Sequence, residues 1–268
     1  AFGSSLGMLC LRRLTQSWSC NLRRGLRHGS VAQAKLEQAT AQSKYRGRKT
    51  DEGLIIFEGD PYRDSCHLVW GAVLWEAGVA LSKFFCWCQA QSGEARHVPA
   101  LSDQAVLELG AGTGIVGLML SKQGAKVTLT DCEPEVMDLL RQNASANGVA
   151  VVTRELHWAD PRTFITDATF DIVVAADVLY TGRDRWFSRA LVAHMEPSTV
   201  AFVACPPRAD SPLEGFLTML LDAGMQIERL ESNIGSPMGS IAGSPLSYFD
   251  GSEFVHMGRD RCRHAVQD

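Results

Sequence analysis

The sequence predicts an α/β fold in which helices cover both faces of a mostly parallel sheet. Apolar strand patterns alternate with helical patterns from residue 105 to residue 231. This order favours a parallel sheet, because a helix carries the chain from the end of one strand to the start of the next. Residues 106–120 also read VLELGAGTGIVGLML, a strand, a glycine-rich loop and a helix. In a parallel sheet such a unit places a ligand beyond the carboxyl end of its strand.

The individual elements follow one another in a regular order. Residues 53–59 have a strand pattern that ends in the Gly-Asp-Pro turn at 59–61, and a helix is expected from about residue 71 to residue 87. Gly124 closes the helix of the glycine-rich unit, and Pro134 lies near the start of the next helix. The other elements expected are strands at 105–109, 126–131, 151–158, 170–180, 199–207, 225–231 and 252–259, and helices at 114–124, 133–148, 183–195 and 212–224.

Charge divides the chain into a basic start and an acidic remainder. Residues 1–50 hold ten of the 26 lysine and arginine residues and one of the 30 acidic residues. The remaining 218 residues therefore carry 16 basic and 29 acidic side chains, a net charge of −13. We expect a basic, disordered extension at 1–50 and one folded domain at 51–268, with a flexible Gly/Ser-rich insertion at 232–247. An acidic domain argues against a nucleic-acid partner, whose contact surface on a protein is basic.

Three features bear on the compartment. Residues 8–30 are rich in arginine and serine and lack acidic residues, a composition that organelle transit peptides share. The apolar stretch 66–88 contains Glu76 and Lys83, so it is predicted to be an amphipathic helix rather than a membrane span. The eight cysteines include no C-x-x-C pair, so neither a metal site nor a disulfide framework is expected. We therefore expect a cytoplasmic protein that does not bind membranes, with a mitochondrion or another organelle as the alternative location.

The glycine-rich loop by itself is compatible with more than one nucleotide-like cofactor. Residues 112–117 match the G-x-G-x-x-G pattern of dinucleotide-binding proteins, but this frame begins two residues late after the strand. The Tyr-x-x-x-Lys pair of dehydrogenases occurs only at 45–49, upstream of the loop, and the phosphate-binding pattern G-x-x-x-x-G-K-[ST] is absent. A second frame, E-x-G-x-G-x-G, is complete at Glu108, Gly110, Gly112 and Gly114.

Two carboxylates lie at the ends of the strands on either side of this loop. Glu108 places a negative charge where a cationic ligand would be stabilised. Asp131 lies 21 residues after Gly110, at the end of the next strand, where a carboxylate accepts hydrogen bonds from both hydroxyls of a ribose. That spacing suits NAD and S-adenosylmethionine equally. Asp131 is also a candidate N-cap for the helix that contains Pro134.

Five motifs in order resemble a known family. The segments GAVLWEAGVALSKFF, ELGAGTGIVG, TLTD, ELHWAD and AADVLY resemble the seven-strand methyltransferases, and among them the protein lysine methyltransferases of methyltransferase family 16. The resemblance covers 53–230. It implies a Rossmann-like sheet of seven strands with an antiparallel last strand, S-adenosylmethionine as cofactor, and a monomer that methylates a lysine side chain of a protein. Transfer to a small-molecule amine, or an inactive module that only binds the cofactor, remain the alternatives.

The resemblance also assigns roles along the cofactor. The loop lies against the amino-acid and ribose parts, Asp131 holds the ribose hydroxyls, and Trp158 lies near the adenine. Trp75 closes the site from the N-terminal helix, and Ala176 passes close to the cofactor at the end of its strand. The cofactor-binding residues expected are Trp75, Glu108, Gly110, Ala111, Gly112, Gly114, Asp131, Trp158 and Ala176.

The predicted catalytic residues are Asp177 and Tyr180, which resemble the family's Asp-x-x-Tyr motif. The motif stands where other N-methyltransferases have Asn/Asp-Pro-Pro-Tyr, and the missing prolines argue against a nucleobase as target. The resemblance implies that Asp177 orients the lysine amine and that Tyr180 walls the channel or accepts a hydrogen bond. An Asp that caps the following helix is the alternative. The family usually has glycine where this chain has Ala159, and neither a nucleophilic residue nor a metal is expected.

Overall fold

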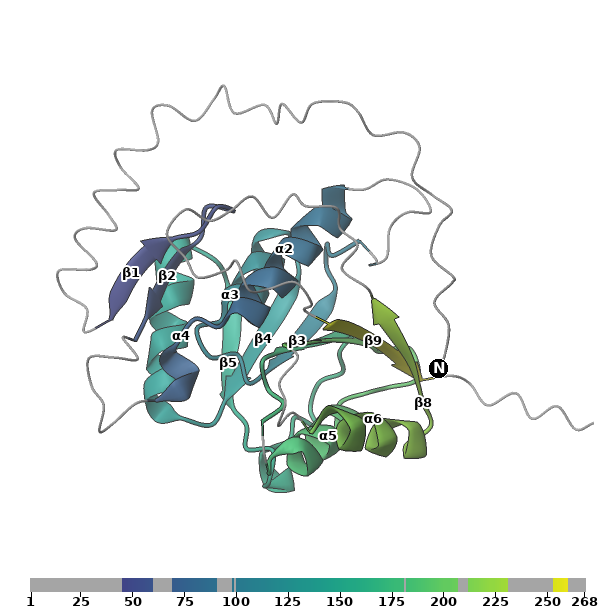
Figure 1. The fold of residues 1–268 in the computed structure, drawn as a ribbon. Coiled ribbons are helices and arrows are strands. Elements are labelled where there is room, and N and C mark those ends of the chain that lie inside the picture. The colour runs from purple at the N-terminus through teal and green to yellow at the C-terminus, as the bar shows by residue number, and fades with distance from the viewer. Residues whose placement is uncertain are drawn as a thin grey trace, which may run out of the picture.

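Seven strands form one central sheet in the order β5-β4-β3-β6-β7-β9-β8 (Figure 1). The computed structural model describes residues 45–59, 69–90, 98, 100–180, 182–206, 212–230 and 253–259. The first five strands of the sheet are parallel, as predicted. The last strand in the chain pairs antiparallel with both of its neighbours. The strands are β3 (Ala105–Leu109), β4 (Lys126–Asp131), β5 (Val151–Glu155), β6 (Ile172–Ala176), β7 (Val200–Cys205), β8 (Met225–Leu230) and β9 (Glu253–Arg259).

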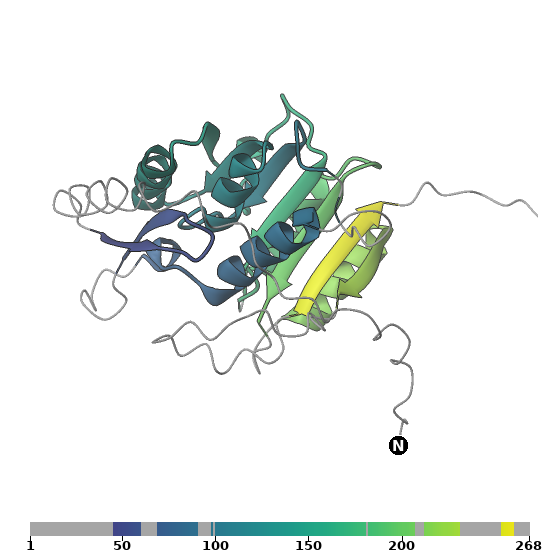
Figure 2. The same cartoon turned by 90° about the horizontal axis from the view of Figure 1, so that it is seen from above.

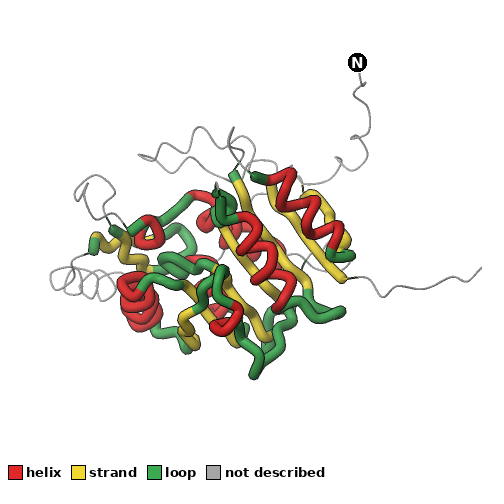
Figure 3. The backbone as a smooth tube through the Cα atoms, turned by 90° about the horizontal axis from the view of Figure 1, so that it is seen from below, coloured by secondary structure: helices red, strands yellow, loops and turns green. Residues whose placement is uncertain are grey.

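Helices cover both faces of this sheet, as predicted (Figures 2 and 3). Successive residues of a strand point to opposite faces, and β3 shows this: Val106 is buried against one group of helices and Leu107 against the other. The first face carries α2 (Glu76–Ala90), α3 (Ile115–Lys122) and α4 (Pro134–Asn147), and the second carries α5 (Asp184–Ala193) and α6 (Leu213–Asp222).

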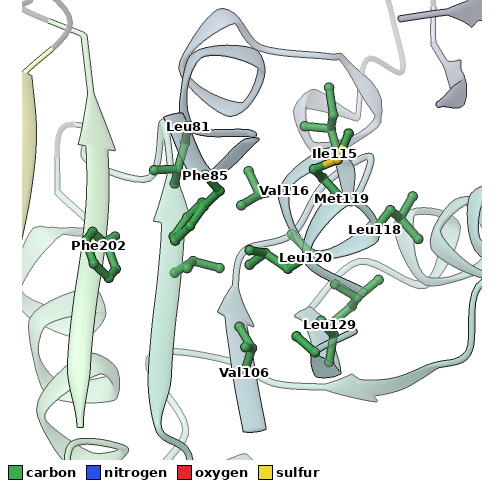
Figure 4. Packing of buried hydrophobic residues seen from close by; sticks show 14 of the residues in the cluster. Leu81, Phe85, Val106, Ile115, Val116, Leu118, Met119, Leu120, Leu129 and Phe202 are labelled. Carbon is green, nitrogen blue, oxygen red and sulfur yellow. The ribbon is translucent and has the colours of Figure 1, made fainter. Parts of the chain in front are cut away.

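The core of the first face is built from large apolar side chains (Figure 4). Phe85 of α2 lies edge-on against Phe202 of β7, with ring centroids 5.2 Å apart. Leu118 of α3 and Leu129 of β4 are fully buried in the same cluster. Burial of this kind contributes about 1.5–3 kcal/mol for each such side chain, so it anchors α2 and α3 to the sheet. Within the described residues, no helix has the length and apolar character that crossing a bilayer requires.

A two-stranded hairpin corrects one sequence prediction. β1 (Arg46–Lys49) pairs antiparallel with β2 (Ile55–Glu58), although its residues fall in the extension expected to be disordered. The sequence RGRK has no strand pattern. Its extended conformation comes from pairing with β2, which local sequence does not reveal. Residues 1–44 and the insertion predicted at 232–247 lie outside the described residues.

Two asparagines on α4 hold this hairpin against the domain. Asn147 accepts a hydrogen bond from the N–H of Ile55 at 2.8 Å and donates one to its carbonyl at 2.6 Å. Asn143 makes the same pair of bonds with Phe57, at 2.7 and 3.1 Å. Asn143 also donates to the carbonyl of Thr113 in the glycine-rich loop at 2.8 Å. The two amides thus replace a neighbouring strand for β2 and connect it to the loop.

The segment between the hairpin and α2 also differs from expectation. The helix predicted from residue 71 begins at Glu76, and a single 3₁₀ turn, η1 (Trp70–Ala72), precedes it. The N–H of Gly59, just after β2, donates to the carbonyl of Ala72 at 2.7 Å. This turn brings Trp70 and Gly71 over the carboxyl ends of β3 and β4, where the candidate site lies.

Candidate functional site

A cavity of about 800 Å³ opens at the carboxyl ends of β3, β4 and β6. Its volume lies within the range of small-molecule and cofactor sites. Both predicted catalytic residues line it, and so do eight of the nine residues predicted to bind the cofactor: Trp75, Glu108, Gly110, Ala111, Gly112, Asp131, Trp158 and Ala176.

The loop after β3 requires glycine for two separate reasons. Gly110 and Gly112 have φ angles of 68° and 55°, a left-handed conformation that disfavours other residues. A Cβ on Gly110 would also lie 2.8 Å from the ring of Trp158, and one on Gly112 would lie 2.9 Å from the carbonyl oxygen of Gly71. The glycines therefore allow the loop to pass close to both walls of the cavity.

Gly114, the ninth residue predicted to bind the cofactor, is not among the residues that line the cavity. It is the N-cap of α3, with a φ of 79°. A Cβ at this position would lie 2.7 Å from Cδ2 of Leu140 on α4. The third glycine of the motif therefore allows α3 to pack closely against α4.

Glu108 is only 2% exposed and stabilises the first turn of α3 through a hydrogen bond. Its Oε2 accepts a hydrogen bond from the N–H of Gly117 at 2.8 Å. A Cβ on Gly117 would lie 2.6 Å from the same oxygen, so the glycine makes this bond possible. Burial raises the pKa of Glu108 to about 8. A cation in the cavity would stabilise the ionised form of this carboxyl group.

Asp131 is oriented by main-chain N–H groups on two sides. Its Oδ2 accepts from Gly112 at 3.1 Å, and its Oδ1 accepts from Cys132 at 2.8 Å and from Glu133 at 3.4 Å. Burial raises its pKa, although these three bonds act in the opposite direction. The N-cap residue of α4 is Glu133, so Asp131 stabilises the turn before the helix. A carboxylate has about four acceptor positions, and three donors leave capacity for a hydroxyl group.

Tryptophans from two distant segments form part of the cavity wall. The Nε1–H of Trp75 donates to the carbonyl of Trp70 at 3.1 Å, and their rings lie 5.8 Å apart. Trp158, just beyond β5, packs edge-on against Phe187 of α5 with ring centroids 5.1 Å apart. Both rings are held by neighbours and also line the cavity, where a flat ligand such as a purine base can stack.

The two predicted catalytic residues lie beyond β6. The strand predicted for 170–180 ends at Ala176 because Asp177 has a left-handed φ of 56°. The N–H of Asp177 donates to the carbonyl of Ala204 in β7 at 2.9 Å, which holds this turn in place. The ring of Tyr180 is 6.5 Å from that of Trp158, and its side chain is 41% exposed. Burial of its hydroxyl raises its pKa.

Glu76 adds a second carboxylate near Asp177. Its pKa is raised by burial and, to a smaller extent, by the charge of Asp177. Glu76 begins α2, whose Gly78 lies close to the end of β6: a Cβ on Gly78 would be 4.0 Å from that of Ala176. At this end of the cavity the wall contains the carboxyl group of Asp177, which suits a cationic amine, and also the guanidinium group of Arg183.

Sequence analysis missed several residues of the wall. Glu133 lies two residues after Asp131, and Arg183 lies three residues after Tyr180. Inspection of the residues next to these predicted site residues would have found both. The turn that carries Trp70 and Gly71 has no local signal, because contacts with β2 and α4 create it. Among the described residues, no group of three His, Cys, Asp or Glu side chains could hold a metal ion. The wall residues not predicted include Trp70, Gly71, Thr113, Cys132, Glu133, His157, Arg183 and Trp186.

Comparison with known proteins agrees with this arrangement. Residues 53–221 match the family model described as lysine methyltransferase. The zebrafish (Danio rerio) protein N-lysine methyltransferase METTL21A is 32% identical over 155 residues, 56% of this chain and 66% of that protein. Mouse (Mus musculus) EEF1A lysine methyltransferase 3 is 30% identical over 162 residues, 59% of this chain and 65% of that protein. The matched part thus spans slightly less than two thirds of either relative.

Solved structures share the fold. The T. thermophilus 16S rRNA N2 G1207 methyltransferase RsmC, in complex with AdoMet and guanosine, superposes with a TM-score of 0.53. The match covers 81% of this chain and 50% of RsmC at 16% sequence identity. Identity this low supports a common architecture and not a common substrate. Since the family model covers well over half of its residues, the chain belongs to the lysine methyltransferase family.

Proposed function

We propose that this protein transfers a methyl group from S-adenosylmethionine to a lysine side chain of another protein. The observation that carries the proposal is that one cavity joins two sets of residues. The glycine loop and Asp131 lie in it beyond β3 and β4, and Asp177 and Tyr180 lie in it beyond β6. A donor and an acceptor bound to the two sets would meet within the same enclosed space.

The residues present fit the cofactor. Gly110 and Gly112 leave room along the loop that a Cβ would fill. Asp131 has acceptor capacity for ribose hydroxyls, and the rings of Trp75 and Trp158 provide apolar faces for the adenine. Glu108 and Asp131 lie in the wall of the cavity, and a sulfonium cation would stabilise the ionised forms of these two carboxyl groups. When bound, S-adenosylmethionine supplies a methyl group already activated by its positive sulfur.

The acceptor lysine requires positioning and loss of a proton. Free lysine has a pKa of about 10.4, so its amine is protonated at neutral pH. Asp177, in the wall of the cavity, would bind the ammonium group, and the nearby carboxyl group of Glu76 would add to this attraction. The carboxylates favour the ammonium form, whereas removal from bulk water favours the neutral amine. The proton would leave to solvent through the open mouth of the cavity before the methyl group is transferred. Alignment of two reactants contributes up to about 7–11 kcal/mol in well-oriented systems, so binding and orientation account for the catalysis we propose.

No side chain is needed as a nucleophile. Burial raises the pKa of the Cys132 thiol in the cavity wall to about 11, so it is a thiol at neutral pH and not a reactive thiolate. The exposed rim favours a protein over a small-molecule acceptor. Trp70, Tyr180 and Trp186 are 62%, 41% and 47% exposed at the mouth of the cavity, and large exposed apolar side chains are typical of protein contact sites.

Calorimetric titration tests the cofactor, and tritium transfer tests the acceptor. We expect the chain to bind S-adenosylmethionine and S-adenosylhomocysteine but not NAD. With tritiated S-adenosylmethionine and a cell lysate, we expect label in protein that acid hydrolysis releases as methyllysine. Binding of NAD alone would remove the cofactor assignment. Label found only in small molecules would favour the alternative acceptor.

A further inference from the structure

One surface of α5 combines positive charge with an exposed aromatic ring. Phe187, Ala190 and Leu191 of this helix are fully buried against the sheet and α6. On the opposite side, Arg185, Trp186 and Arg189 are exposed, and we refer to these three residues as the α5 face. Their spacing places them together on one side of the helix.

The two arginines of this face have no acidic partner among the residues that the structure describes. Within the part of the chain that the structure describes, neither Arg185 nor Arg189 makes an ion pair or a side-chain hydrogen bond. By contrast, Arg141, Arg154 and Arg162 each lie within 2.7 Å of a carboxylate oxygen. Like charges four residues apart destabilise a helix. The α5 face therefore keeps an unfavourable pair of charges in a domain that is otherwise strongly acidic.

The α5 face is continuous with the mouth of the cavity. Trp186 belongs to both, since it lines the cavity and is 47% exposed. Arg183, just before the helix, also lines the cavity and lies 5.6 Å from the ring of Tyr180. A polypeptide whose lysine reaches Asp177 would therefore have α5 directly beside it.

We propose that the α5 face docks an acidic segment of the protein substrate next to the target lysine, an inference that rests on the proposed function. Arginine binds carboxylates through two parallel hydrogen bonds, and tryptophan and arginine are the residues that most often dominate binding at protein interfaces. A short acidic segment with an apolar residue matches this combination. A nucleic acid fits less well, because the domain's net charge of −13 repels a long polyanion.

Peptide binding by the full-length chain tests the proposal. The probe is a fluorescent glutamate-rich peptide with a central lysine, and a second peptide has glutamine in place of each glutamate. We expect the glutamate peptide to bind more tightly in fluorescence anisotropy. The double variant Arg185→Glu/Arg189→Glu should weaken it about tenfold, because two attractions become two repulsions. The matched control, Lys126→Glu/Arg141→Glu, makes the same change in net charge away from α5 and should have little effect.

Several outcomes would overturn the proposal: no binding of the glutamate peptide, equal binding of the glutamine peptide, or an equal loss in the control variant. Tighter binding of a single-stranded oligouridylate, lost in the α5 variant, would assign the surface to nucleic acid instead. Calorimetry with S-adenosylmethionine on every variant verifies that the fold is retained. A glutamate peptide with glutamine in place of its lysine separates docking from catalysis. If that peptide binds through α5 while no methyl transfer is found, the docking surface stands and the proposed function fails.

Discussion

At the ends of β3 and β4 the carboxyl groups of Glu108 and Asp131 are bonded to the main chain, whereas beyond β6 the side chains of Tyr180 and Trp186 at the mouth of the cavity are exposed. Glu108 and Asp131 both accept hydrogen bonds from N–H groups of the loop and helix around them. Tyr180 and Trp186 instead present roughly half of their surface to solvent. The two ends of the cavity thus differ in how many of their side chains already have partners within the protein.

This difference matches what each end is proposed to bind. A cofactor of constant structure favours a preorganised site, because groups already in place need no reordering when the ligand arrives. A protein substrate brings its own surface and can bury exposed aromatic and arginine side chains on docking. Substitutions at the cofactor end should therefore affect stability and cofactor affinity, and substitutions at the acceptor end should affect turnover.

The largest effect is expected at Asn143, which is fully buried. Asn143→Ala leaves the N–H and C=O of Phe57 and the C=O of Thr113 without their partner. Each unpaired buried group costs about 1–3 kcal/mol, so we expect a loss of roughly 3–5 kcal/mol in the free energy of unfolding, measured with urea. Asn147→Ala, at a partly buried position on the same helix, is the control and should lose less. A larger loss for Asn147→Ala would show that the connection to the loop is unimportant.

Asp177 tests the acceptor end. We expect Asp177→Asn to lower kcat about 100-fold, while the affinity for S-adenosylmethionine stays nearly unchanged. Asparagine is the suitable replacement because it tolerates the left-handed φ of 56°, so the change removes charge without straining the turn. Methyl transfer at saturating cofactor gives kcat, and calorimetry gives the affinity. Normal turnover of this variant would mean that the carboxylate of Asp177 has no part in methyl transfer.

A substitution of Asp131 tests the cofactor end of the cavity, where we expect affinity to change and turnover to stay the same. Asp131→Asn removes a charged acceptor and should weaken binding of S-adenosylmethionine about tenfold, with turnover at saturating cofactor little changed. Asp138→Asn, on the exposed side of α4, removes the same charge outside the cavity and is the matched control. Equal affinities for the two variants would take Asp131 out of the binding site.

The last prediction concerns the dependence of stability on pH. The pKa of Glu108 is raised by burial from 4.5 to about 8, so the folded chain holds a proton that the unfolded chain has lost between these values. Stability should therefore fall as pH rises toward 8, by at most about 1.4 kcal/mol per pH unit. Burial lowers the pKa of His194 from 6.5, which acts in the opposite direction below that pH.

Between pH 7 and pH 8 the effect of Glu108 therefore dominates, because a histidine with a pKa of 6.5 or lower has lost most of its proton there in both states. Thermal unfolding of the chain and of Glu108→Gln at several pH values in this window measures the effect. Glutamine can still accept the hydrogen bond from Gly117 but does not titrate. The stability of Glu108→Gln should therefore change less with pH than that of the unmodified chain. Parallel profiles would show that Glu108 does not titrate in this range.

Sequence alone determined the order of the elements and most of the site. The carboxyl ends of parallel strands meet at one edge of a sheet, so residues that follow β3, β4 and β6 had to gather there. Glu108 and Asp131, at the ends of β3 and β4, were predicted in this way, and Asp177 was predicted from the family resemblance; all three line the cavity. The family resemblance then distinguished S-adenosylmethionine from NAD, which spacing by itself left open.

Only the tertiary structure decided the rest, because it depends on contacts between distant parts of the chain. The bonds from Asn143 and Asn147 to β2 join residues 86 and 92 positions apart, and they account for a hairpin that includes residues predicted to be disordered. Gly114 lies so close to Leu140 of the next helix that a side chain would not fit there. The 3₁₀ turn that brings Trp70 over the cavity likewise has no local pattern. Local sequence limits the conformations that a segment can adopt, and contacts with distant parts of the chain stabilise one of them.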